Sequence, residues 1–343
     1  MLYISKEQST IIKGVAISMM LFLHLFNGQH TDLCTNLFYV GDVPLALWLT
    51  RACNPVSFFL LLSGYGLACK YEGESLSPRY QFKRILILYL HYWVVLAIFL
   101  VIGHLLHPSQ YPGSLSTLIA NVSGWNTDYC SEMWFLLPYS LVSLLSLYII
   151  RVINRIGLGW ALLGTACLQV LTSFMISRFG VFFYTHMLAY QPLLFIHMLY
   201  TFTLGVVLRR TSLHLNFKKT SPLYQAVIVL CIFALVILQC VIGFGLGYMY
   251  NTPLIVILIC QLNFPSWIKN ILLELGRKSM PIWMIHCWLA YYLFTPQVYS
   301  LKYPVLIFIG LAVASYLLSI LVMWIVGVIR RAIVVVTQEN KDL

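Results

Sequence analysis

The sequence has few charged residues. Only 9% of its residues are charged and 61% are hydrophobic, whereas soluble domains carry about 25% charged residues. This excludes an ordinary water-soluble globular protein. The apolar residues form runs of about twenty, the length that crosses roughly 30 Å of hydrocarbon as a helix. We therefore expect an all-α, polytopic integral membrane protein.

Cysteine motifs for metal binding are also absent. The nine cysteines form no Cys-x-x-Cys pair and no Cys/His set with metal-ligand spacing, so we expect no metal site. Most of them lie in apolar runs, where cysteine acts as a small hydrophobic residue. Only Cys34 and Cys130 fall in predicted external loops, and the sequence is compatible with a disulfide between them or with two free thiols.

Acidic residues are scarce as well, and the net charge is +11. A strongly basic chain suggests nucleic acid as a partner, but the Lys and Arg residues here form short clusters between apolar runs. That distribution is typical of cytoplasmic loops of membrane proteins. We interpret the charge mainly as membrane topology, with a minor share for binding an anionic cofactor, and expect no nucleic-acid partner.

Polar, Pro and Gly clusters divide the chain into ten predicted transmembrane helices within a single domain, 1–343. The seventh and eighth helices are separated only by the glycine-containing run 243–247. No small-x-small cleavage site follows the first helix, so we expect it to be retained rather than removed as a signal peptide. The predicted ranges are 10–27, 43–69, 84–106, 132–150, 158–178, 190–208, 222–242, 246–263, 271–294 and 303–329.

The positions of the basic residues support an even number of helices. With ten, all of the 21 Lys and Arg residues except Arg51, Arg178 and Lys302 fall on the side that also holds both termini. The positive-inside rule makes that side cytoplasmic. An odd number would separate the termini and destroy this pattern. The sequence therefore predicts about ten helices with both termini in the cytoplasm.

Histidines are the main polar residues at predicted membrane depth. His24 follows Lys13, which marks the entry of the first helix, by about 16 Å of helical rise. His286 lies about 12–14 Å into a later helix that runs in the same direction. Neutral imidazole suits proton transfer near pH 7, but buried polar groups also commonly bond neighbouring helices, so both interpretations stay open. Two further histidines fall near these levels: His91 and His197.

Four short motifs occur in order over residues 13–286. They are Lys13-Gly14 with His24 downstream, the segment Asn54 to Tyr65 with its Phe-Phe and Ser-Gly-Tyr, Met133-Trp-Phe-Leu136, and the segment that begins Leu275-Gly and ends at His286. In that order, they resemble the motifs of the acyltransferase family 3 membrane proteins, although Gln81, Ile87 and Trp283 depart from the family's pattern.

The resemblance implies transfer of an acyl group, usually acetyl from acetyl-CoA, to a hydroxyl of a surface polysaccharide or its lipid-linked precursor. His24 would be the general base, and His286 would pair with it or bind the acceptor. Basic residues at the cytoplasmic rim would hold the CoA phosphates, with membrane anchoring as the other interpretation. They are Lys13, Lys83 and Arg84, of which Arg84 is the better candidate in its helix because Gln81 occupies a position that is commonly basic.

Further positions are expected to contact the donor or the acceptor. Ser63 belongs to a Ser-Gly-Tyr-Gly segment that lacks bulk at two places, so that a helix or a pantetheine arm could approach closely. Trp134 and Phe135 would stack on a sugar or belong to the interfacial aromatic belt. Glu132 lies at the outer rim beside them and is also expected to bind the substrate.

The sequence thus predicts an inner-membrane, multi-pass O-acyltransferase, an O-acetyltransferase of capsule, exopolysaccharide or lipopolysaccharide sugars. Its partners would be acyl-CoA, a sugar or lipid-linked glycan acceptor and membrane lipids, with no permanently bound cofactor. The main alternative is a transporter or flippase for a glycan or lipid, although such proteins often show inverted repeats and none is visible here. A membrane sensor or scaffold without catalysis is the second alternative.

Overall fold

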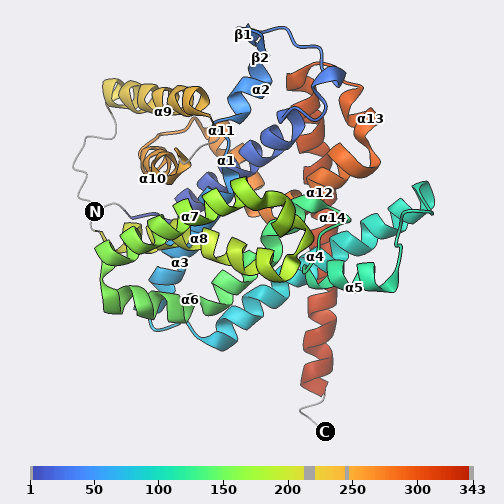
Figure 1. Ribbon diagram of the computed structural model, residues 1–343, viewed down its shortest axis with the longest axis horizontal. Coiled ribbons are helices and arrows are strands. Elements are labelled where there is room, and N and C mark those ends of the chain that lie inside the picture. Colours follow the sequence, from blue (N-terminus) through green and yellow to red (C-terminus); the bar gives the residue numbers. More distant parts are fainter. Residues whose placement is uncertain (1–2, 212–220, 244–246, 340–343) are drawn as a thin grey trace.

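The computed structural model describes residues 3–211, 221–243 and 247–339, and these residues form a bundle of helices with one two-stranded antiparallel hairpin (Figure 1). This confirms the predicted all-α class. In chain order the elements are α1 (Lys6–Phe26), η1 (Thr31–Leu33), β1 (Tyr39–Val40), β2 (Val43–Pro44), α2 (Leu45–Thr50), α3 (Pro55–Glu72), α4 (Pro78–Leu106), α5 (Leu115–Ser123), η2 (Ser131–Phe135), α6 (Leu136–Ile156), α7 (Leu158–Thr185), α8 (Met187–Arg210), α9 (Pro222–Ile242), α10 (Tyr248–Ile259), α11 (Ser266–Arg277), α12 (Ser279–Cys287), η3 (Trp288–Leu293), α13 (Thr295–Tyr299) and α14 (Pro304–Glu339).

Eight helices within the described ranges are long and apolar enough to cross a membrane, so the chain is a multi-pass membrane protein. They correspond to the first seven predicted helices and to the tenth. The predicted eighth helix is the shorter α10, with 12 residues. The cytoplasmic location of both termini stays a prediction, and three of the basic residues behind it lie outside the described residues: Lys218, Lys219 and Lys341.

The predicted ninth helix, 271–294, is not one continuous helix. It is divided at Lys278, whose backbone leaves the helical region (φ −105°, ψ 8°), into α11 and α12. The cause is Pro281, because a proline ring clashes with the carbonyl group four residues before it in a continuous helix. Beyond α12 the chain continues as the π-helical segment η3. The expectation of an unbroken helix was wrong because Pro281 stands among apolar residues that continue the hydrophobic run.

Glycines permit a very close contact between α3 and α8. A Cβ atom added at Gly64 of α3 would lie 2.1 Å from the carbonyl oxygen of Phe202 in α8, and one added at Gly205 of α8 would lie 2.1 Å from that of Leu61 in α3. These distances are far below van der Waals contact, so each helix uses its glycine to approach the backbone of the other. Helices α3 and α8 therefore form a fixed pair.

The centre of the bundle consists of α1, α3, α6, α8 and α12, which contact one another and surround the space described below. Helix α14 runs along one side and extends beyond the other helices at its C-terminal end, whereas α9 and α10 lie together at another edge (Figure 1). The central helices supply most of the lining of the two cavities described below, to which α4, α7 and α10 also contribute.

The long segment 107–131, predicted to be external, packs against α4. Tyr92 donates to the carbonyl oxygen of Asn121 (2.8 Å) and Trp93 to that of Val122 (2.9 Å), so that α5 is held against this helix. None of its residues lines either of the two cavities described below. The segment thus connects α4 to α6 without forming part of either cavity wall.

Candidate active site

Two cavities lie end to end along α1. The first, which we call the Lys13 cavity, has a volume of about 410 Å³. It is formed by residues of α1, α3, α4 and α12, with one residue each from η2 and α6. Its lining residues are Ser9, Lys13, Met20, Phe59, Leu62, Ser63, Gly66, Leu67, Lys70, Tyr80, Arg84, Leu88, Phe135, Tyr139, Ser279, Met280 and Trp283.

The second cavity, which we call the His24 cavity, has a volume of about 310 Å³. It is formed by the last turns of α1, the start of α3, η2, the start of α10, and residues of α7, α8 and α12. Its lining residues are Met20, Leu23, His24, Cys53, Asn54, Pro55, Val56, Ser57, Leu60, Glu132, Trp134, Phe135, Gln169, His197, Met198, Thr201, Tyr248 and Trp283. The two cavities thus lie toward opposite ends of the central helices.

The Lys13 cavity is positively charged. Three cations, Lys13, Lys70 and Arg84, line it, and no carboxylate does. Such a cluster attracts polyanions, and a guanidinium group suits phosphate in particular. Lys83, also predicted to bind the donor, is exposed and is not among the lining residues, so the structure does not place it in this site.

Gln81, which interrupts the family pattern, positions Arg84. Its side chain is fully buried and donates to the Ser143 carbonyl oxygen (2.5 Å), while its own oxygen accepts from Arg84 Nη1 (3.0 Å). Arg84 also lies 3.3 Å from the Ser143 hydroxyl and 3.5 Å from that of Tyr139. A neutral, buried residue at position 81 therefore holds the Arg84 guanidinium at the cavity wall.

The segment around Ser63 combines both functions that the sequence left open. Gly64 makes the close helix contact with α8, whereas Gly66 has no neighbouring atom within 4 Å of an added Cβ and lines the Lys13 cavity. Ser63 lines the same cavity, with its hydroxyl 3.5 Å from that of Tyr139. One glycine thus serves helix packing and the other leaves space for a ligand.

His24 lies in the last turn of α1 and lines the cavity that bears its name. Its imidazole centroid is 5.1 Å from that of His286, so the structure brings the two predicted histidines together. Tyr291 donates its hydroxyl to the His24 carbonyl oxygen and accepts from Asn27 Nδ2 (3.0 Å). These bonds fix the end of α1, and with it the His24 ring.

His286 lies behind His24 rather than at the cavity surface. It is fully buried, and its Nδ1 is 2.7 Å from the Trp283 carbonyl oxygen, which makes that nitrogen the protonated one. Its Nε2 is therefore an acceptor and lies 3.0 Å from the Cys287 sulfur. His286 can consequently position His24 or relay a proton, but it does not line either cavity.

His24, His286 and Cys287 also form the one group of potential metal-ligand atoms found among the described residues, within 4.8 Å of one another. The Nδ1 and Nε2 atoms of His286 already have protein partners, and one of these is the Cys287 thiol itself. We therefore interpret the group as a hydrogen-bonded cluster suited to proton transfer.

The π-helical segment η3 contacts both α1 and η2, two of the elements that line the His24 cavity. Its Tyr291 binds the end of α1, and its neighbour Tyr292 donates to Glu132 Oε2 (2.9 Å). A π turn places successive side chains differently from an α-helix and is frequent at functional sites. Neither tyrosine was predicted from the sequence, because no local pattern signals a π turn. The adjacent Tyr-Tyr pair beyond His286 was the available signal.

The wall of the His24 cavity opposite η2 is polar. Gln169 Nε2 lies 2.8 Å from His197 Nε2 and 2.5 Å from the Tyr248 hydroxyl, and Thr172 lies 3.0 Å from His197 Nδ1. The Gln169 Oε1 atom is buried and has no hydrogen-bond partner among the described residues. Three helices, α7, α8 and α10, therefore present a hydrogen-bonding wall suited to a substrate rich in hydroxyl groups.

The remaining sequence candidates divide between these places. Glu132 and Trp134 line the His24 cavity, and Phe135 lines both cavities. His91, by contrast, is buried and its Nδ1 contacts the carbonyl oxygen of Ile87 one turn earlier (2.8 Å), away from either cavity. For His91 the structure thus favours a buried polar group bonded to a helix backbone over a residue that takes part in proton transfer.

Cys34 and Cys130 are free thiols in the structure. The Cys34 sulfur lies 3.6 Å from the His30 carbonyl oxygen, and that of Cys130 lies 3.6 Å from Glu132 Oε2. Burial raises the pKa of both thiols, which keeps them protonated. Of the two alternatives left by the sequence, the structure has the free thiols.

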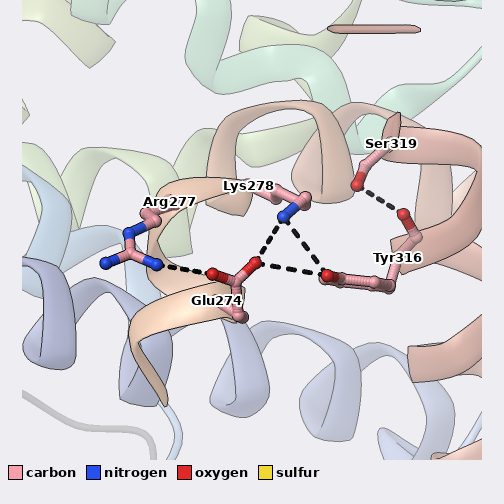
Figure 2. A network of polar contacts seen from close by, with 5 residues as sticks. All are labelled: Glu274, Arg277, Lys278, Tyr316 and Ser319. Carbon is pink, nitrogen blue, oxygen red and sulfur yellow. Dashed lines mark hydrogen bonds and ion pairs between the residues drawn. The ribbon is translucent and has the colours of Figure 1, made fainter. Parts of the chain in front are cut away.

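A polar network fixes the junction from which α12 begins (Figure 2). Glu274 accepts from Arg277 (2.5 Å) and Lys278 (2.6 Å), and Tyr316 of α14 donates to it (3.2 Å). The hydrogen bonds from Lys278 and Arg277 lower the pKa of the Glu274 carboxyl to about 2. The network thereby links α11 to α14. The network holds the start of α12, which carries Ser279 into the Lys13 cavity.

Comparison with known proteins agrees with this arrangement. The family model described as an acyltransferase domain matches residues 8–327, a range that contains every lining residue of both cavities. No curated protein and no solved structure matches the chain. The two cavities that lie end to end along α1, one cationic and one bearing His24, are therefore within the matched range. The chain belongs to the acyltransferase family 3 of membrane proteins.

Proposed function

We propose that the protein is an O-acyltransferase that moves an acetyl group from acetyl-CoA in the Lys13 cavity to a hydroxyl in the His24 cavity. The acceptor is a surface polysaccharide or its lipid-linked precursor, and the membrane is the inner, cytoplasmic membrane. The observation that carries the proposal is that the two cavities lie end to end along one helix. Each has the chemistry that one of the two substrates requires.

The cations of the Lys13 cavity support its assignment to the donor. Coenzyme A carries several phosphate charges, and Lys13, Lys70 and Arg84 would pair with them at the end of the cavity where Lys70 is exposed. The pantetheine arm then lies along Ser63 and Gly66, where the lack of a Cβ atom leaves space. Its thioester reaches the end of the cavity nearest His24.

Proton transfer at His24 supports the reaction type. The acceptor oxygen forms a bond to the acyl carbon while the C–S bond of the thioester breaks. The hydroxyl proton passes to the His24 imidazole, and the CoA thiolate leaves and takes up a proton. A positioned general base of this kind contributes about 10²- to 10⁴-fold to a rate. Glu132 and the wall around His197 supply hydrogen-bonding groups for the other hydroxyls of a sugar.

The positions of Lys13 and His24 agree with transfer across the membrane. They are separated on α1 by about 16 Å of helical rise, roughly half of the hydrocarbon thickness. With the donor on the cytoplasmic side, which the basic residues predict for the Lys13 end, the acceptor is modified at the opposite end. The acyl group, and not the donor, then crosses.

The test combines the host polymer with isolated membranes. Proton NMR of the surface polysaccharide from a gene-deletion strain is expected to lack one O-acetyl signal, which the wild-type gene restores. Membranes given [¹⁴C]acetyl-CoA are expected to label the glycan fraction. A polymer that is absent altogether, with no label transferred by wild-type membranes, would contradict the proposal and favour a transporter or flippase.

A further inference from the structure

The Lys13 cavity and the His24 cavity share three lining residues. Met20, Phe135 and Trp283 line both, and every other lining residue belongs to one cavity alone. The same order is found along the central elements. On α1, Lys13 precedes Met20 and His24 follows it, and on α12 Met280 precedes Trp283. One layer of three side chains thus separates the two spaces.

These three side chains fill the layer closely. Met20, Phe135 and Trp283 are 4%, 5% and 7% exposed, although each touches both cavities. The Phe135 and Trp283 rings meet edge to face, with centroids 5.6 Å apart, an attractive geometry for aromatic pairs. Each residue comes from a different element, α1, η2 or α12, so the position of the layer depends on tertiary packing.

We infer that Met20, Phe135 and Trp283 form an acyl-selective barrier, which accommodates a short acyl group during transfer and excludes longer ones. The inference rests on the proposed function for the identity of what passes, and on the two cavities for the location. The donor thioester meets the barrier from the Lys13 side and the hydroxyl from the His24 side. When the C–S bond breaks and the C–O bond forms, the acyl methyl lies among these three side chains.

The barrier therefore sets the acyl length. An additional methylene that a close-fitting apolar site cannot accommodate costs about 10- to 200-fold in specificity. Trp283 is the largest of the three side chains, so its truncation makes the largest opening. Met20 is flexible and adapts to its surroundings, and its truncation makes a smaller one.

The experiment measures acyl preference in membranes that contain the full-length protein. Acetyl-CoA, butyryl-CoA and hexanoyl-CoA are supplied to wild type, Trp283→Ala and Met20→Ala. The matched control is Phe59→Ala, since Phe59 is an aromatic residue that lines the Lys13 cavity alone. We expect Trp283→Ala to raise the butyryl-to-acetyl ratio at least tenfold, Met20→Ala to raise it less, and Phe59→Ala to leave it unchanged. An unchanged ratio in both barrier variants, or an equal change in Phe59→Ala, would overturn the inference.

A second measurement does not depend on acyl transfer. Cys53 lines the His24 cavity and not the Lys13 cavity. Lys70 marks the exposed end of the Lys13 cavity. A small, membrane-impermeant methanethiosulfonate reagent is added to sealed vesicles on the Lys70 side, and labelling of Cys53 is read by mass spectrometry. Trp283→Ala is expected to become labelled and wild type to stay unlabelled. Labelling of wild type from that side would show that no barrier exists, whether or not the protein transfers acyl groups.

Discussion

The two cavities have similar volumes, about 410 and 310 Å³, and opposite chemistry. The Lys13 cavity has three cations and no carboxylate. The His24 cavity has no Lys or Arg, but two histidines and a carboxylate. A single helix, α1, contributes Lys13 to the first and His24 to the second.

In the proposed reaction, the cationic cavity and the cavity that bears His24 would separate anion binding from proton transfer. A cation beside the general base would disfavour its protonated form and weaken it as a base. Placing the cations toward the rim and the imidazole about 16 Å along the same helix avoids that conflict. Substitutions in the two cavities should therefore affect different kinetic constants.

Replacement of His24 should have the largest effect. His24→Ala is expected to lower kcat for acyl transfer by about 10²- to 10⁴-fold, because it removes the proposed base. Binding of CoA to membranes should be unchanged, since His24 lies outside the Lys13 cavity. The measurements are transfer of labelled acetyl to glycan and equilibrium binding of CoA. Full activity in His24→Ala would remove this residue from the mechanism.

Arg84 should affect the donor alone. Arg84→Gln is expected to raise the KM for acetyl-CoA by about 10- to 100-fold, as for the loss of a charged hydrogen bond worth about 1.5–3 kcal/mol, and to leave the KM for the acceptor unchanged. Lys83→Gln is the matched control, because this neighbouring cation is exposed and lies outside the cavity. Equal effects of the two substitutions would mean that both cations act only through general charge at the membrane surface.

His197 should affect the acceptor alone. His197→Ala removes a member of the hydrogen-bonding wall, and we expect the KM for the glycan acceptor to rise about tenfold, the effect of about 1.5 kcal/mol. The KM for acetyl-CoA should not change. His91→Ala is the control, since this buried histidine bonds within its own helix and lines neither cavity. A rise in the donor KM instead would contradict the division between the cavities.

Glu274 should have the smallest effect, because its side chain is 40% exposed. Glu274→Gln is expected to lower stability by less than about 1 kcal/mol, read as a small decrease in Tm in detergent. The pKa of this carboxyl falls to about 2 from an ordinary value of 4.5, so its ion pairs stabilise the fold above about pH 4.5 and lose that effect as the pH falls toward 2. The Tm difference from wild type should shrink over that range. A difference independent of pH would exclude the ion pairs as its cause.

Periodicity and charge alone located most of the fold. The lengths of the apolar runs predicted seven helices from α1 to α9 and the last one, α14, because crossing a bilayer requires a fixed length. They did not reveal the break at Lys278, since Pro281 lies inside an apolar pattern. The spacing of Lys13 and His24 predicted their order in depth, because helical rise is constant.

The class of protein, the family resemblance and the level of each polar residue along its own helix all follow from the amino-acid sequence. Which helices meet became visible only in the folded chain, and with it that His286 lies behind His24, that Lys83 lies outside the site, and that Gln81 positions Arg84. It also brought together Met20, Phe135 and Trp283. Depth is a local property set by helical rise, whereas contact depends on how helices rotate and pack. That packing depends on features such as the glycine contacts between α3 and α8, which join residues far apart in the chain.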